Sequence, residues 1–180
     1  MAIKILRPDI ILKDLRGNIN TRIKKLNNDE YDAIILAATG VQKLGIQNEV
    51  KYFTPIDTDT MIPSMGQATL GIETTDNPEI IKLISVLNNQ DAEIESTIER
   101  TFVHTLQGGC QVPIGVKATI IDENVKLKAI VGMPDGSEYI TEEIQVEKSA
   151  YKTAGIDFAQ KFVDKGAKEL LKRAEKVAFI

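Results

Sequence analysis

Apolar and polar residues recur with two different periods along the chain. In the first part, short apolar runs at residues 10–12 and Ala33–Ala38 each lead into a glycine-containing turn, which predicts buried strands. Between them, Ile19, Ile23 and Leu26 recur at helical spacing. A strand, a helix and a strand within about 30 residues predict a βαβ unit with a parallel sheet.

A turn-rich stretch then leads to two further helices. A strand is expected near Ala68–Glu73, followed by a helix with Asn77 as its cap and Pro78 in its first position. In the next helix the apolar positions recur every four residues, and Gly108 is expected to end it; those positions are Ile94, Ile98, Phe102 and Leu106.

After residue 112 the apolar residues alternate with polar ones. Three such runs, 113–122, 125–133 and 137–146, predict three antiparallel strands, and residues 154–178 predict one long amphipathic helix. The predicted fold class is therefore α/β plus α+β. A partial βαβ parallel-sheet lobe is followed by a C-terminal module of a helix, three antiparallel strands and a helix.

Charge and composition narrow the classes of function. The chain has 180 residues, 43% hydrophobic and 27% charged, with a net charge of −4. Residues 1–52 carry nine Lys and Arg against six Asp and Glu. This excess of positive charge is either chance variation between two solvated surfaces or the sign of an anion site in this segment. It is too small to suggest a nucleic-acid surface. With no long apolar run and a single cysteine, a cytoplasmic protein without membrane segments is expected.

The only cysteine, Cys110, stands in the sequence LQGGCQVPIG. A lone cysteine is commonly a buried small hydrophobe, but Gly108 and Gly109 leave room for a bulky group to approach. The thiol follows a helix C-terminus, which raises rather than lowers a thiol pKa, and no histidine or aspartate is placed to act as its base. These features favour a thiol that forms one lasting bond over a nucleophile that turns over.

Other polar residues have simpler interpretations. Arg16 and Arg22 flank a predicted strand-to-helix turn and could bind a carboxylate or phosphate, or could merely be solvated. His104 is interpreted as structural, and no spacing of residues suggests a metal site. The acidic residues Glu93, Glu95 and Glu99 are expected to form a solvated helix face.

Three segments in order resemble one family: residues 15–46, which begin LRGNINTR, IPSMGQATLGIE at residues 62–73, and LQGGCQVPIG. The chain resembles hydroxymethylbilane synthase, also called porphobilinogen deaminase. The resemblance implies a transferase of porphyrin and heme biosynthesis, which joins four porphobilinogen molecules into hydroxymethylbilane and releases ammonia. The growing linear pyrrole chain is carried on a dipyrromethane cofactor.

The resemblance also implies roles for residues. Cys110 would hold the dipyrromethane through a thioether. Further cofactor contacts would come from Arg16, Arg22, Gly66, Gln67 and Gly109. The substrate would be bound by Arg16, Asn18, Arg22 and Lys43. Lys43 stands where relatives usually have arginine, and Ala68 stands where they usually have glycine.

The resemblance implies that most of the first of three domains is missing, with the aspartate that handles protons. The expected division is a partial second domain at 1–67, a crossing segment of the absent domain at 68–89, and a cofactor-anchoring domain at 90–180. No residue of this chain is assigned as catalytic, so the chain alone is expected to be inactive. The family is usually monomeric, but this chain could self-associate. The alternatives are a non-catalytic module that binds a carboxylated ligand or a partner protein, and a structural domain with an inert Cys110.

Overall fold

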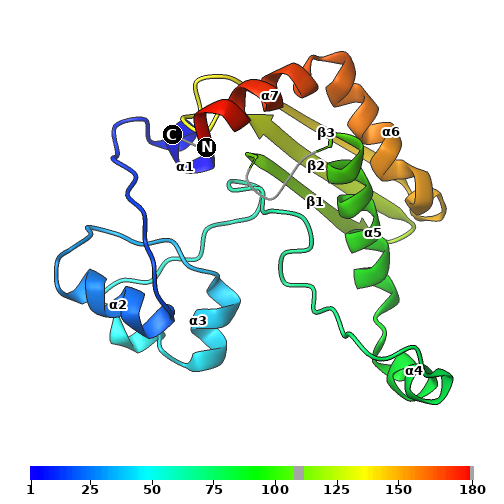
Figure 1. Cartoon of the computed structure of the whole chain (residues 1–180), viewed down its shortest axis with the longest axis horizontal. Helices are drawn as coiled ribbons and strands as arrows, with labels where there is room; N and C mark the ends of the chain where they lie inside the picture. Colours follow the sequence, from blue (N-terminus) through cyan, green and yellow to red (C-terminus); the bar gives the residue numbers. More distant parts are fainter. Residues whose placement is uncertain (108–111, 179–180) are drawn as a thin grey trace. The chain divides into compact units, whose positions relative to one another are not determined.

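The computed structural model describes residues 1–107 and 112–178 (Figure 1). The helices are α1 (Ala2–Leu6), α2 (Ile19–Asn27), α3 (Ala38–Leu44), α4 (Pro78–Ile84), α5 (Gln90–Thr105), α6 (Tyr151–Asp164) and α7 (Ala167–Ala178), with short 3-10 turns η1 (Gln47–Glu49), η2 (Ser85–Leu87) and η3 (Lys148–Ala150). The strands are β1 (Ile114–Ile121), β2 (Asn124–Gly132) and β3 (Tyr139–Glu147). The chain forms two compact units: the sheet unit, with residues 1–8 and those from 58 onward, and the α2–α3 unit, Asp9–Asp57.

The sheet unit is built on three antiparallel strands in the order β1-β2-β3. Val116 of β1 pairs with Ala129 of β2, and Leu127 of β2 pairs with Ile144 of β3. Alternate residues of the strands are buried beneath α5, α6 and α7, which run along the sheet in Figure 1. Because side chains alternate between the two faces of a strand, the other face carries Lys117, Lys126 and Lys128.

Three aromatic rings form the centre of the core under this sheet. Phe102 of α5 lies 5.2 Å from Phe158 and 5.1 Å from Phe162 of α6, measured between ring centroids, and all three side chains are fully buried. The rings of Phe102 and Phe158 are tilted, whereas Phe162 meets both of them edge to face. Aromatic contacts of these kinds add to the hydrophobic free energy of burial. The predicted helix, three antiparallel strands and closing helical region are thus confirmed, and the sheet unit has an α+β fold.

The closing helix differs from the expected single helix. It ends at Asp164 and a second helix begins at Ala167, because Gly166 adopts a left-handed conformation with φ +87°. This break allows Leu170 and Leu171 of α7 to be buried with the core. Helix α5 also ends earlier than expected, at Thr105, and Gln107 takes φ +56°. The predicted end at Gly108 lies outside the described residues.

The three strands predicted before residue 74 are not formed. Residues 10–12 and 68–73 belong to no helix or strand, and Ala38 begins α3 instead of ending a strand. A strand needs a neighbour to receive its main-chain hydrogen bonds, and within the described chain only β1, β2 and β3 pair. Ile11, with 84% of its surface exposed, shows that the apolar run alone does not bury this segment. The parallel-sheet lobe is therefore not part of the described structure.

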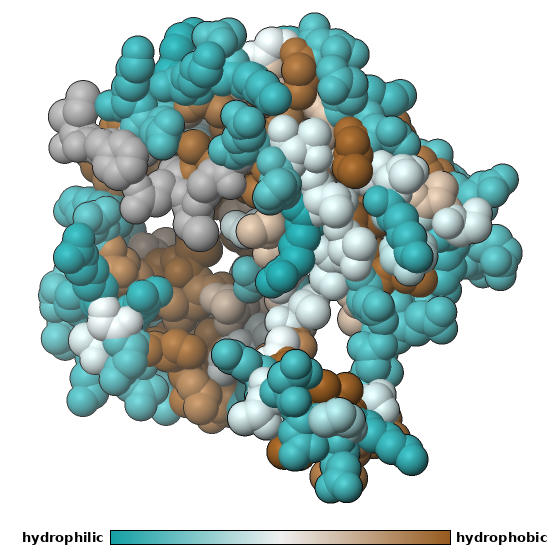
Figure 2. Space-filling view, turned by 45° about the vertical axis from the view of Figure 1, so that its right-hand side comes forward, coloured by the Kyte–Doolittle hydropathy of each residue, from teal (hydrophilic) through white to brown (hydrophobic). Residues whose placement is uncertain are grey.

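The helix predicted after Asn77 is confirmed. Asn77 accepts a hydrogen bond from the Glu79 amide, and Pro78 occupies the first turn of α4. Its apolar residues remain accessible, however: Leu83 is 74% exposed and Val86, just beyond, is 82% exposed. Figure 2 shows apolar atoms mixed with polar ones on the surface of this segment. The amphipathic pattern thus forms the helix without a covering element in the described residues.

We predict that Gly155→Ala destabilises the sheet unit. A Cβ at Gly155 in α6 would overlap Thr101 Oγ1 and the Ile98 carbonyl of α5, where the two helices cross. Alanine gains up to about 1 kcal/mol of helix propensity, but overpacking of a crossing costs about 1–3 kcal/mol. Urea unfolding should show a net loss of stability. The control is Gly71→Ala, where nothing lies within 4 Å of the added Cβ, and equal stability of the two variants would contradict the prediction.

Candidate functional site

The turn that begins α2 is shaped by its own residues. Gly17 has φ +119°, a conformation that side chains rarely adopt, and a Cβ there would lie 2.9 Å from Thr21 Cγ2. Asn18 caps the helix, because its Oδ1 accepts hydrogen bonds from Thr21 N and Thr21 Oγ1, both at 2.9 Å. The sequence RGN therefore forms one defined turn at the start of α2.

Two cations of α2 reach back to this turn. Arg22 Nε donates to the Gly17 carbonyl at 2.7 Å, and Lys25 Nζ donates to the Arg16 carbonyl at 3.4 Å. The Nε contact fixes the guanidinium plane beside the turn, and a guanidinium has four further N–H groups to offer to an anion. The structure thus brings together Arg16, Asn18 and Arg22, three of the predicted site residues, at the first turn of α2.

Helix α3 packs against the same end of α2. The Ile19 side chain lies 3.2 Å from the position of a Cβ on Gly40, so a larger residue at 40 would push the two helices apart. Val41, Ile46 and Ile23 form the small core of the α2–α3 unit. Lys43, the fourth predicted substrate residue, is exposed in the last turn of α3.

Gly66 and Gln67, predicted to contact the cofactor, lie in the sheet unit. Gln67 N donates to the Ser64 carbonyl at 3.3 Å, and Thr69 N donates to the Gly66 carbonyl at 3.1 Å. Both Gly66 (φ +65°) and Ala68 (φ +70°) are left-handed. Glycine tolerates this conformation, but for alanine it costs about 1–2 kcal/mol, so the turn carries strain that other contacts must offset.

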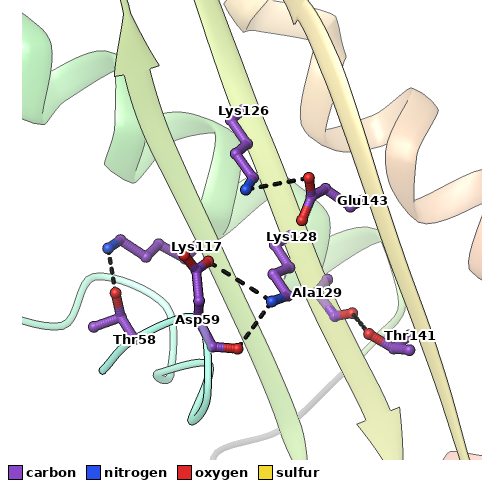
Figure 3. A network of polar contacts seen from close by, with 8 residues as sticks. All are labelled: Thr58, Asp59, Lys117, Lys126, Lys128, Ala129, Thr141 and Glu143. Carbon is purple, nitrogen blue, oxygen red and sulfur yellow. Dashed lines mark hydrogen bonds and ion pairs between the residues drawn. The ribbon is translucent and has the colours of Figure 1, made fainter. Parts of the chain in front are cut away.

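The segment before this turn is attached to the open face of the sheet (Figure 3). Lys117 Nζ donates to Thr58 Oγ1 at 2.5 Å, and Lys128 Nζ donates to the Asp59 carbonyl at 2.8 Å. Further along, the Pro63 carbonyl accepts a hydrogen bond from Val116 N at 2.9 Å. Residues 58–67 therefore follow β1 and belong to the sheet unit.

A buried carboxylate joins the turn to the sheet. Glu99 of α5 is only 7% exposed; its Oε2 accepts from Gly66 N at 2.7 Å and its Oε1 accepts from Ala118 N at 2.9 Å. One helical turn earlier, Glu95 Oε1 accepts from Ile120 N at 3.0 Å. The prediction of a solvated acidic face is thus wrong for Glu95 and Glu99, although Glu93 is exposed as expected.

The reason for this error is geometric. Glu95 and Glu99 are four residues apart, one position beyond the apolar Ile94 and Ile98, so they border the buried face of α5. That border meets β1, the first strand of the sheet, whose N–H groups need acceptors on the side away from β2. The four-residue spacing beside the apolar stripe was the signal available in the sequence.

Burial raises the pKa of the Glu99 carboxyl above its usual value. The hydrogen bonds from Ala118 N and Gly66 N, and the charge of Lys117, oppose this effect by favouring the carboxylate, whereas the charge of Glu95 adds to it. Burial is the largest of these causes because the side chain lies between α5 and the sheet.

Cys110 and Gly109, the predicted site of covalent attachment, lie outside the described residues. They fall between the end of α5 at Thr105 and the start of β1 at Ile114. His104 is exposed in the last turn of α5. Residues 1–107 and 112–178 contain no group of three His, Cys, Asp or Glu side chains that could hold a metal ion, and no helix among them is long and apolar enough to cross a membrane.

Comparison with known proteins identifies the family. Residues 1–82 match the family model described as porphobilinogen deaminase, dipyromethane cofactor binding domain, and residues 93–164 match the one described as porphobilinogen deaminase, C-terminal domain. The chain belongs to the porphobilinogen deaminase family. The α2 turn and the Gly66–Gln67 turn both lie in the part that matches the cofactor-binding domain.

Relatives of this family are similar over nearly the whole chain. Porphobilinogen deaminase of Aliarcobacter butzleri is 72% identical over 180 residues, which are 99% of this chain and 58% of that protein. Those of a Nitratiruptor species and Campylobacter hominis are 52% and 50% identical, again over 99% of this chain. The chain spans 57–58% of the length of these three relatives.

We predict that Glu99 makes the stability of the sheet unit depend on pH. Because its native pKa is raised, the native state holds the proton more tightly than the unfolded state, where a glutamate has a pKa of about 4.3. The resulting stabilisation is complete below that value and is lost as the pH rises through the native pKa. The free energy of unfolding should be measured in urea against pH for the wild type and Glu99→Gln. Their difference should fall with pH across this window, by at most about 1.4 kcal/mol per pH unit, and a difference that rises would contradict the prediction.

Proposed function

We propose that this chain is the part of a porphobilinogen deaminase that holds and anchors the dipyrromethane on which hydroxymethylbilane is assembled. The observation that carries the proposal is the α2 turn, in which Arg22 is fixed on the Gly17 carbonyl at 2.7 Å. This turn lies inside the residues that match the cofactor-binding family model. The alternative is a binding module for a carboxylated ligand without chemistry.

The residues of the turn fit a carboxylated pyrrole. A dipyrromethane with acetate and propionate side chains offers several carboxylates, which arginine binds with two parallel hydrogen bonds. Arg22 has its Nε held by the main chain, so little side-chain freedom is lost when its other nitrogens bind an anion. Arg16 and Asn18 stand at the same turn and would add a second cation and an amide. Lys43 would contribute charge to substrate binding without a bidentate fork.

We assign the anchoring role to the thiol of Cys110, which would form a thioether with the dipyrromethane, with Gly109 leaving space beside it. When bound, the dipyrromethane supplies the pyrrole to which four porphobilinogen units are added, each with loss of ammonia. The arginines bind and orient the carboxylates of cofactor and substrate, while the Gly66–Gln67 turn lies against the cofactor. We assign proton transfer at the pyrrole nitrogens to none of the residues of this chain.

We further propose the domain division 1–67, 68–89 and 90–180, with the βαβ lobe completed by the part of the protein that these residues do not include. That part, expected to be the N-terminal domain, would supply the proton-handling aspartate and cover the exposed apolar residues of α4. The chain spans 58% of the relative from Aliarcobacter butzleri, so the remaining 42% is long enough for such a domain. By itself the chain would then bind without completing the reaction, and its exposed α4 would favour self-association.

We predict that Cys110 carries a pyrrole adduct after incubation with porphobilinogen, when the chain is combined with the portion of the Aliarcobacter butzleri protein that it does not span. Intact mass should show two added pyrrole units on the chain, and an Ehrlich reagent should give the pyrrole colour. Cys110→Ser should show neither, because the oxygen of serine is a far weaker nucleophile than a thiolate.

The outcomes of this experiment separate the alternatives. Bilane formation by the combined parts supports the proposed function. Stable association of the parts without adduct or bilane contradicts it. Binding of porphobilinogen without any adduct on Cys110 favours the non-catalytic binding module. If Cys110→Ser unfolds the chain, Cys110 is instead a structural core residue.

We predict that Arg22→Lys weakens adduct formation roughly tenfold or more. Lysine keeps the charge but loses the planar fork and the Nε bond to Gly17, and a hydrogen bond to a charged group contributes about 1.5–3 kcal/mol. The rate of adduct formation should be measured against porphobilinogen concentration. The matched control is Arg100→Lys, an exposed arginine on α5, and equal rates for the two variants would exclude the α2 turn from the site.

A further inference from the structure

The free edge of β1 receives its hydrogen-bond acceptors in a regular order. The N–H groups of Val116, Ala118 and Ile120 point to the same side, since alternate residues of a strand do. Val116 N donates to the Pro63 carbonyl, Ala118 N to Glu99 and Ile120 N to Glu95. The two glutamates therefore perform the same task for the strand.

Glu99 differs from Glu95 in its second oxygen. While Oε1 holds β1, Oε2 accepts from Gly66 N at 2.7 Å, so one carboxylate connects α5, β1 and the Gly66–Gln67 turn. Both contacts lie in the sheet unit, and the carboxylate is almost fully buried. Buried hydrogen bonds to a charged acceptor are stronger than neutral ones, and losing one partner leaves the other group unsatisfied.

The turn that Glu99 holds is a strained one. Gly66 and Ala68 are both left-handed, with φ +65° and φ +70°. The turn's own hydrogen bonds, from Gln67 N to Ser64 and from Thr69 N to Gly66, are at 3.3 and 3.1 Å. The 2.7 Å bond to Glu99 is the shortest of the three and ties the turn to a helix and a strand of the core.

We propose that Glu99 is a positioning residue, which fixes the Gly66–Gln67 turn in the conformation that contacts the cofactor. Its part in cofactor binding rests on the function proposed above; its hold on the turn does not. Glu99 acts through the main chain of Gly66 and touches neither cofactor nor substrate. Helix α5, which carries Glu99, ends at Thr105, five residues before Cys110 in the sequence.

Replacing Glu99 by glutamine tests this role, because glutamine keeps the shape of the side chain and removes one of its two acceptor oxygens. In Glu99→Gln one oxygen can still accept from Ala118 N, but the NH2 group would face the Gly66 N–H, donor against donor. The matched control is Glu95→Gln, on the same helix face, in which the remaining amide oxygen can still accept from Ile120 N and the turn is untouched. If Glu99 served only the free edge of β1, the two variants would behave alike.

The first measurement needs no activity. Amide hydrogen exchange and ¹⁵N–¹H spectra of the 180-residue chain should show the Gly66 amide protected in the wild type and in Glu95→Gln. In Glu99→Gln its protection should fall roughly tenfold or more, and its chemical shift should no longer follow the titration of a carboxyl. Unchanged protection at Gly66 in Glu99→Gln would overturn the proposal.

The second measurement is the rate of adduct formation on Cys110 in the combined parts, with porphobilinogen as the probe. We expect a loss of at least about tenfold in Glu99→Gln and an unchanged rate in Glu95→Gln, at a pH and temperature where urea unfolding shows both variants to be folded. Equal rates in the wild type and Glu99→Gln, with Gly66 protection lost, would show that the hydrogen bond between Glu99 and Gly66 does not position the site. Absence of adduct in the wild type would contradict the proposed function, while the exchange data would still decide whether Glu99 fixes the turn.

Discussion

The sheet unit depends on how the outer edge of β1 is satisfied. A strand at the edge of a sheet has a row of unpaired N–H groups, which cost free energy when buried and invite other strands when exposed. Here two glutamates of α5 and the Pro63 carbonyl of residues 58–67 supply the acceptors. This arrangement closes the edge and attaches α5 and residues 58–67 to the sheet with the same contacts.

The dependence on charged acceptors has a physical cost. Burying Glu99 raises its pKa, so the carboxylate that makes the two bonds is less favourable than one in water. Hydrophobic residues could not replace it, because Ala118 N and Gly66 N would then lack partners. A polar group at this border is retained because the main chain on both sides requires it.

The sequence was sufficient to predict those elements that depend on residues close to one another in the chain. The cap at Asn77, the four-residue spacing of Ile94, Ile98 and Phe102, and the alternation along β1 to β3 each predicted the element that forms. It failed where an element needs a partner, since the apolar runs at 10–12 and 33–38 resemble buried strands but no described strand pairs with them. The site divides in the same way. The cluster of Arg16, Asn18 and Arg22 follows from one turn, whereas the Glu99–Gly66 contact joins residues 33 apart and left no motif to recognise.

The two sets of contacts differ in how far apart their residues are in the sequence, and this separation affects the order in which they form during folding. The contacts that shape the α2 turn join residues three to nine apart, so the entropy lost in closing their loops is small. Such contacts can form early and be populated in short peptides. The bond between Glu99 and Gly66 requires α5, β1 and residues 58–67 to be assembled first. During folding, the α2 turn with its arginines would therefore form before Glu99 can hold the Gly66–Gln67 turn.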